Sequence, residues 1–155
     1  MGRWITESEH TFTEDVPAPP GDVRAFYVDL DNIRLVHPLV VSVRSLDRTQ
    51  TAGGYVQTYL VGDRIPVGRL RLRTSYVARL HVPAAGEVRS EARQFPRVRL
   101  RSTVSFEPTA AGTRVVERIV IEAPRPLAAL TTRKAVEAHT AMLAGIRRRF
   151  ATASS

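Results

Sequence analysis

The sequence predicts an α+β fold in which a curved seven-stranded antiparallel sheet wraps around one long C-terminal helix. An alternating strand pattern over residues 5–16 precedes two short helical segments. About ninety residues of further strand patterns follow, without another helix. One long amphipathic helix, expected over residues 126–151, comes last. This order of elements favours a sheet that curls around the helix and leaves a hollow between the two.

The two short helices are expected directly after the first strand. Pro19 and Pro20 suit the start of the first helix, because an early proline loses no helical hydrogen bond. Asp31 or Asn32 can cap the second helix, and Pro38 disfavours its continuation. The first helix has its apolar side chains at i, i+3, i+4 and i+7, on one face: Val23, Phe26, Tyr27 and Leu30.

The middle of the chain alternates between apolar and basic side chains, which is typical of an antiparallel sheet with one wet face. Turn signals rich in glycine and proline separate these strands, for example at residues 52–54, 83–86 and 108–112. Apolar or uncharged residues of one strand share a single face: Leu70, Leu72, Thr74, Tyr76, Ala78, Leu80 and Val82. A later strand repeats the pattern with Val98, Leu100, Val104 and Phe106.

The last helix carries one apolar stripe, made of Val136, His139, Leu143, Ile146 and Phe150. A helix of about 25 residues is about 37 Å long, which is enough to cross a seven-stranded sheet. Its stripe should therefore face the concave side of the sheet.

Composition narrows the classes of function. A chain of 155 residues fits one domain, and the absence of cysteine excludes disulfides and thiolate metal sites. No apolar run is long enough for a membrane span, and no signal peptide is visible, so we expect a cytoplasmic protein. Neither a phosphate-binding loop nor a metal motif is present, so we expect no cofactor and no metal.

The net charge of +8 would suit an acidic partner, but Lys134 is the only lysine among 23 basic residues. A preference for arginine, with abundant alanine and valine, is also typical of a GC-rich genome. The arginines gather on the predicted outer sheet face, where few aromatic residues interleave them. A base-stacking nucleic-acid surface is therefore disfavoured. This group comprises Arg71, Arg73, Arg79, Arg89, Arg93, Arg97, Arg99 and Arg101.

Residues 16–39 resemble the opening of the START-domain-like polyketide cyclase/dehydrase (SRPBCC) superfamily. There a strand runs into a Pro-Ala-Pro motif, and an amphipathic helix, an aspartate-rich turn and a short helix ending near His-Pro follow. The matching pieces here are Pro17-Ala18-Pro19, Val23 to Leu30, Asp29 to Asn32 and His37-Pro38, and the resemblance continues through residues 112–117 into the last helix.

This resemblance covers nearly the whole chain and implies one START-like domain over residues 1–155 with the helix-grip fold. It also implies a cavity, since the superfamily largely holds lipids, polyketides, quinones or plant-hormone-like molecules. One departure is clear. Family members often place tryptophan in the first helix or just before His-Pro, whereas the only tryptophan here is Trp4.

Two ionisable residues stand out as site candidates. His139 interrupts the apolar stripe of the last helix, so its imidazole needs a buried partner or a ligand. Glu117 shares strand parity with Val115, Ile119 and Ile121, so it should point inward. An inward carboxylate has its pKa raised unless a cation or hydrogen-bond donors compensate. The alternative for His139 is a core histidine bonded to a tyrosine or a backbone carbonyl. For Glu117 it is a structural ion pair with His139 or an inward arginine.

Tyr76 lies on an apolar strand face and could present its hydroxyl to the cavity. His37 precedes Pro38 near the expected cavity mouth, where an exposed loop histidine is the simpler interpretation. The full set of expected ligand-binding residues is His37, Phe26, Leu72, Tyr76, Leu100, Phe106, Glu117, Ile119, His139 and Leu143.

Three functions fit these observations. The first is binding of a small hydrophobic or aromatic molecule (lipid, polyketide or quinone-like) in the cavity. The second, implied by the resemblance, is a polyketide cyclase, aromatase or dehydratase acting on a carrier-bound chain. In that case His139 or Glu117 would remove a proton next to a carbonyl, Tyr76 would stabilise the enolate, and an acidic carrier protein would meet the arginines. The third is a partner or nucleic-acid interaction through the basic sheet face.

Overall fold

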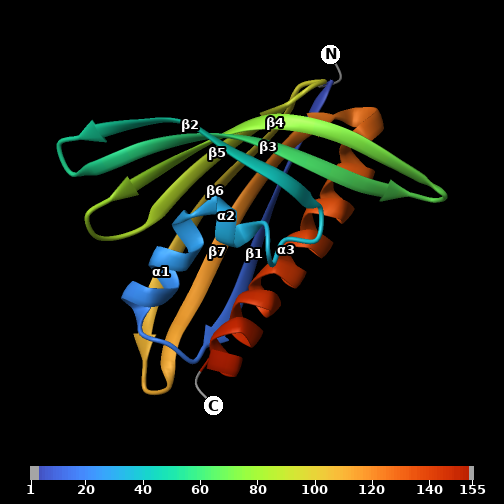
Figure 1. The fold of residues 1–155 in the computed structure, drawn as a ribbon. Helices are drawn as coiled ribbons and strands as arrows, with labels where there is room; N and C mark the ends of the chain where they lie inside the picture. The colour runs from blue at the N-terminus through green and yellow to red at the C-terminus, as the bar shows by residue number, and fades with distance from the viewer. Residues whose placement is uncertain (1–3, 154–155) are drawn as a thin grey trace.

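The computed structural model describes residues 4–153 and confirms the predicted helix-grip arrangement (Figure 1). These residues form seven strands and three helices. The strands are β1 (Ile5–Val16), β2 (Val40–Thr51), β3 (Gly54–Val67), β4 (Leu70–Pro83), β5 (Val88–Gln94), β6 (Val98–Thr109) and β7 (Gly112–Pro124). The helices are α1 (Pro20–Val28), α2 (Leu30–Ile33) and α3 (Arg125–Ala153).

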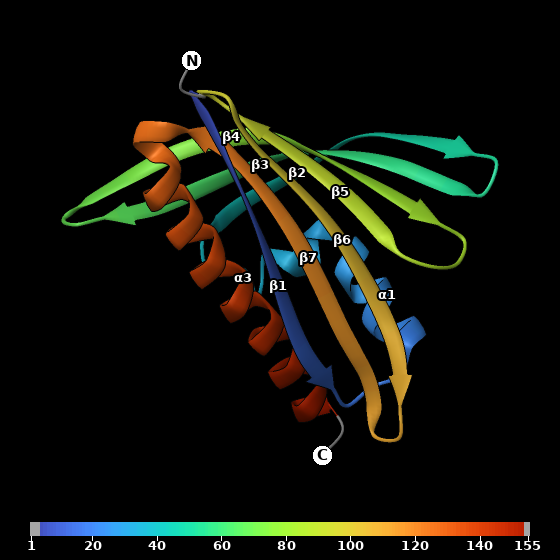
Figure 2. The ribbon, with the colours of Figure 1, turned by 180° about the vertical axis from the view of Figure 1, so that it is seen from behind.

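All seven strands pair antiparallel in one sheet of order β1-β7-β6-β5-β4-β3-β2. Because β1 joins the far side of β7, the chain needs a crossover between β1 and β2, and α1 and α2 lie in that crossover. Both views show the sheet strongly curved, with all three helices on its concave side (Figures 1 and 2).

Helix α3 packs against β1 and β7, at one end of the sheet. It does not cover the sheet evenly, and the β3–β4 hairpin projects beyond it (Figure 1). The concave face of the middle strands is therefore left open to a cavity. The expected α3 over residues 126–151 was slightly short, since the helix spans Arg125–Ala153.

The short helices follow the first strand as the sequence predicts, with two corrections. Leu30, expected on the first helix, is the first residue of α2, because α1 ends at Val28. Pro19 precedes α1 in an extended conformation, and Pro20 is its first residue. The α2 cap is Asp29, not Asp31 or Asn32, because the Asp29 carboxylate accepts a hydrogen bond of 3.0 Å from the Asp31 amide. A side-chain acceptor at this position satisfies an amide that the short helix leaves free.

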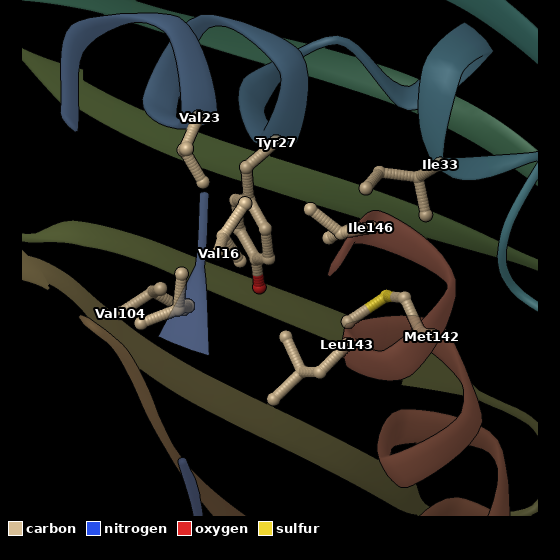
Figure 3. Packing of buried hydrophobic residues seen from close by; sticks show 9 residues of the cluster. Val16, Val23, Tyr27, Ile33, Val104, Met142, Leu143 and Ile146 are labelled. Carbon is tan, nitrogen blue, oxygen red and sulfur yellow. The ribbon is translucent and has the colours of Figure 1, made fainter. Parts of the chain in front are cut away.

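A hydrophobic core fills the half of the concave space between α1, the C-terminal half of α3 and strands β1, β6 and β7. Figure 3 shows the Tyr27 side chain reaching from α1 into the middle of this core, toward Leu143 of α3. A second cluster, centred on Tyr59, Val61 and Leu80, lies on β3 and β4. The cavity lies where the packing of the first cluster ends.

Candidate functional site

The candidate site is a cavity of about 250 Å³ enclosed by three parts of the fold. One wall is the concave face of β3 to β6, and another is the N-terminal half of α3. The segment from α2 into β2 closes the third side. Most of its lining is apolar, as in Ile33, Leu39, Leu72, Ala78, Leu100 and Ala138.

Glu117 on β7 is the centre of a buried polar cluster. Its side chain is fully buried, as the inward parity of the strand predicts. The Tyr27 hydroxyl donates a hydrogen bond of 2.5 Å to Glu117 Oε2, and His139 Nδ1 is bonded to Glu117 Oε1. A carboxylate only accepts hydrogen bonds, so Nδ1 carries the proton. The cluster therefore joins α1, β7 and α3 through one carboxylate.

Burial and charge act in opposite directions on the pKa values of Glu117 and His139. Burial disfavours the ionised Glu117, but the charge of His139 and the hydrogen bonds from His139 and Tyr27 together lower the pKa of the carboxyl. Burial likewise disfavours a charged His139, yet Glu117 outweighs it and raises the pKa of the imidazole. Burial, and then Glu117, raise the pKa of Tyr27. Both shifts favour the carboxylate–imidazolium form of the pair, with a neutral tyrosine beside it.

The imidazole of His139 also forms part of the cavity wall. Its Nδ1 is held by Glu117, and its Nε2 makes no hydrogen bond within residues 4–153. The Phe12 ring stacks on it with centroids 6.1 Å apart, and the His37 ring meets it edge-on at 5.6 Å. These contacts fix the plane of the ring. His139 can therefore present a positively charged N–H group to a bound molecule.

His37 is a wall residue too, so its interpretation as an exposed loop histidine was wrong. Its Nδ1 accepts a hydrogen bond of 3.2 Å from the Leu39 amide. Burial, followed by the nearby charge of His139, lowers the pKa of His37 to about 3. The ring is neutral at physiological pH, and its contact with His139 could not be inferred from either residue's position in the sequence.

Asp63 is a wall residue that the sequence interpretation missed. It lies on β3, is 8% exposed and lines the cavity. Within residues 4–153 its Oδ1 is buried without a hydrogen-bond partner. Burial raises the pKa of this carboxyl to about 6, although the charge of His139 opposes the shift.

A signal for Asp63 was present in the sequence. Gln57, Tyr59, Val61 and Asp63 are all buried, and Ile65 continues the same parity along β3. Continuing the alternation beyond Tyr59 would have placed the aspartate on the inner face. The pattern is hidden because residues 55–60 have both polar and apolar side chains on each face of the strand.

Five of the ten expected ligand-binding residues line the cavity: His37, Leu72, Tyr76, Leu100 and His139. Tyr76 is half-buried in the wall, and burial, followed by the charge of Asp63, raises the pKa of its hydroxyl.

The prediction that the other five expected residues line the cavity was wrong. Among the described residues, Phe26, Phe106, Glu117, Ile119 and Leu143 are not part of the wall of this cavity. Phe26 packs edge-on against Phe150, and Phe106 packs edge-on against Tyr27. The physical reason is that α1 and the C-terminal half of α3 fill this part of the groove with their own side chains.

The outer face of the sheet carries most of the expected arginines, and several of them are paired. Arg97 instead lies in the turn between β5 and β6. The strand register places Arg79 opposite Glu91 and Glu91 opposite Arg101 on one face. Glu91 binds Arg93 and Arg99, and Arg101 binds Glu122. Such exposed pairs contribute little to stability. These glutamates neutralise part of the positive charge of the outer face.

Two further observations concern the described part of the chain. No group of three or more histidine, aspartate or glutamate side chains in residues 4–153 is arranged to hold a metal ion. None of α1, α2 and α3 is long and apolar enough to cross a membrane.

Comparison with known proteins gives one family. A model of the family described as "Polyketide cyclase / dehydrase and lipid transport" matches residues 9–151. A comparison with curated proteins found no match.

Several solved structures share the fold. The chain is similar to TTHA0849 from Thermus thermophilus, with a TM-score of 0.74, 21% identity, and coverage of 97% of this chain and 100% of that one. The chain is also similar to the di-domain ARO/CYC BexL from the BE-7585A biosynthetic pathway, with a TM-score of 0.71 and 16% identity. The match covers 93% of this chain and 50% of that chain. The Zhui aromatase/cyclase from Streptomyces sp. R1128 matches with a TM-score of 0.63 and 18% identity, and the match covers 94% of this chain and 95% of that chain. At these identities the likeness shows the fold alone.

Proposed function

Because the chain belongs to the polyketide cyclase/dehydrase and lipid transport family, we propose that it binds a small hydrophobic or aromatic molecule in the cavity between sheet and α3. A lipid, a polyketide or a quinone-like compound fits this description. The observation that carries the proposal is the cavity of about 250 Å³, with its mainly apolar wall and few polar groups. Burying apolar ligand surface there would contribute roughly 25 cal/mol per Å² before the costs of association.

The test is to fill the cavity from the sheet side. Ala78 on β4 is buried and lines the cavity, whereas the adjacent Val77 is 43% exposed on the opposite face of the strand. Ala78→Trp should therefore abolish binding of the neutral fluorescent probe N-phenyl-1-naphthylamine, while Val77→Trp should bind it like the natural protein. Circular dichroism establishes that both variants are folded. Equal binding by the two variants would argue against a ligand cavity at this wall.

A second candidate function is catalysis of the cyclase, aromatase or dehydratase type on a carrier-bound chain. The observation that favours it is the His139–Glu117 pair, which holds a charged imidazole at the cavity wall. His139 would donate a hydrogen bond to a substrate carbonyl oxygen and so stabilise the negative charge that develops on that oxygen in the transition state. Glu117 would act as a positioning residue, because the fully buried carboxylate does not line the cavity. An acidic carrier protein would dock on the outer arginines.

Catalysis and binding predict different effects of the same variants. If the protein is an enzyme, His139→Ala should reduce the turnover of a polyketone thioester strongly and leave its affinity nearly unchanged. If the protein only binds, His139→Ala should change affinity alone. Phe12→Leu removes the ring stacked on His139 without removing a charge, so it serves as the control for disturbed packing.

A further inference from the structure

We propose that Asp63 is a ligand-recognition residue, which accepts a hydrogen bond from a hydroxyl group of a neutral aromatic or polycyclic ligand. This inference rests on the proposed binding function and specifies its chemistry. Asp63 was not among the candidates that the sequence analysis singled out. It lies on the β3 wall of the cavity, on the opposite side from α3.

One carboxylate oxygen of Asp63 has no hydrogen-bond partner in the described part of the chain. The residue is 8% exposed, and within residues 4–153 no side chain or backbone group donates to its Oδ1. Buried polar atoms are nearly always hydrogen-bonded, so an orphaned carboxylate oxygen in a cavity wall indicates a missing donor. Thr74 faces Asp63 in the β3–β4 register, and its own hydroxyl is also buried and unpaired. Even if it turned toward the carboxylate, the two oxygens would keep acceptor sites for a ligand.

The charges of the surrounding wall also favour a neutral ligand. Lys134 and His139 of α3 line the same cavity, and Glu117 favours the charged form of His139. Glu91 also borders the cavity, but its carboxylate is paired with Arg93 and Arg99. Two cationic groups disfavour a ligand that carries an ammonium group. A ligand carboxylate placed against Asp63 would meet a like charge. A neutral O–H donor satisfies the carboxylate without either penalty.

The side chains around Asp63 favour a ligand with an aromatic or fused-ring body. Close to Asp63 the wall contains the ring of Tyr76 and the apolar side chains of Val61, Ile65 and Leu72. An aromatic or fused-ring body packs well against such side chains. The hydroxyl then fixes the orientation of an otherwise apolar ligand, which is the usual role of a few polar groups in an apolar pocket.

The experiment compares two probes that differ only at the oxygen, 2-naphthol and its methyl ether. Both can be measured by displacement of N-phenyl-1-naphthylamine at near-neutral pH, where the naphthol is not ionised. Because hydrogen bonds to charged acceptors are the stronger class, we expect the natural protein to prefer the naphthol by about tenfold or more. Asp63→Val should abolish this preference and bind the ether at least as well. Asp63→Asn keeps the shape and a weaker acceptor, so its preference should be intermediate.

Asp47→Val is the matched control, since it removes the same charge from an exposed position on β2 and should keep the full preference. Equal affinity of the natural protein for both probes, or an undiminished preference in Asp63→Val, would overturn the role of Asp63 while leaving the cavity in place. Failure of the natural protein to bind N-phenyl-1-naphthylamine or either probe would instead overturn the proposed binding function, and this inference with it. Asp63→Asn gives the same decision if Asp63→Val does not fold.

Discussion

Replacing Asp63 by asparagine should stabilise the protein at neutral pH, and the gain in the free energy of unfolding should grow as the pH rises. Burial raises the pKa of the carboxyl from 3.8 to about 6, with His139 acting in the opposite direction. The folded protein therefore holds this proton more tightly than the unfolded chain does. Well below pH 3.8 the Asp63 carboxyl is protonated in both the folded and the unfolded state, so there is no cost of ionising it on folding. As the pH rises toward and past about 6, ionising the buried group makes folding progressively less favourable.

The size of the effect follows from the two pKa values. A difference of roughly two pKa units corresponds to about 3 kcal/mol above the folded-state pKa. Only about 1 kcal/mol of this penalty is present at about pH 4.5, so some 2 kcal/mol should develop between about pH 4.5 and about pH 7.5. The free energy of unfolding of Asp63→Asn, relative to the natural protein, should rise by this amount over that interval.

The assay is urea denaturation followed by circular dichroism at several pH values, on the natural protein, Asp63→Asn and Asp47→Asn. Taking differences between proteins at each pH removes the titration of groups whose pKa does not depend on the charge of Asp63, such as His37. Asp47 is exposed, so its variant should show no comparable trend. A stability difference for Asp63→Asn that is independent of pH would refute the reasoning, because it would mean that Asp63 is ionised in the folded protein without penalty.

Other substitutions test the buried cluster and the strand turns. Tyr27→Phe removes the 2.5 Å hydrogen bond to a buried carboxylate and should lower the free energy of unfolding by about 2 kcal/mol in urea denaturation; a loss below about 0.5 kcal/mol would contradict this. Glu117→Gln should cost about 3 kcal/mol, because it leaves a buried imidazolium without its counter-charge. Since the pKa of Glu117 is lowered from 4.5, its stabilising effect is complete above that pH and is lost as the pH falls through the folded-state pKa, so the stability difference between the two proteins should shrink in acid. Gly54→Ala should destabilise the protein, because the added Cβ would lie 2.1 Å from the Val82 carbonyl oxygen, whereas Gly53→Ala meets nothing within 4 Å; equal melting temperatures would contradict this account.

Local chemistry was sufficient to predict the elements and most of their faces. The alternation along β4 placed Ala78, Leu80 and Val82 on the buried face, as the structure shows. The parity of β7 likewise predicted that Glu117 points inward. These predictions succeed because a strand repeats every two residues, so a few side chains of known polarity determine the orientation of the others.

Tertiary structure decided which inward side chains line the cavity and which fill the core. Periodicity identifies the inner face of a strand but not the element that covers it. Because α3 packs against β1 and β7, Ile119 is buried beneath it, while Leu100 and Tyr76 further along the sheet remain in the cavity wall. Contacts between distant segments, such as His37 with His139, depend on the same packing.

The sequence by itself determined the order of strands and helices, the inner and outer faces of the sheet, and the inward orientation of Glu117. The partners of its carboxylate were decided only by the fold, since Tyr27 and His139 lie 90 and 22 residues away in the chain. The fold likewise decided that Asp63 Oδ1 has no hydrogen-bond partner within residues 4–153. A sequence pattern shows where a polar group points, but whether another group meets it depends on how the helices pack onto the curved sheet.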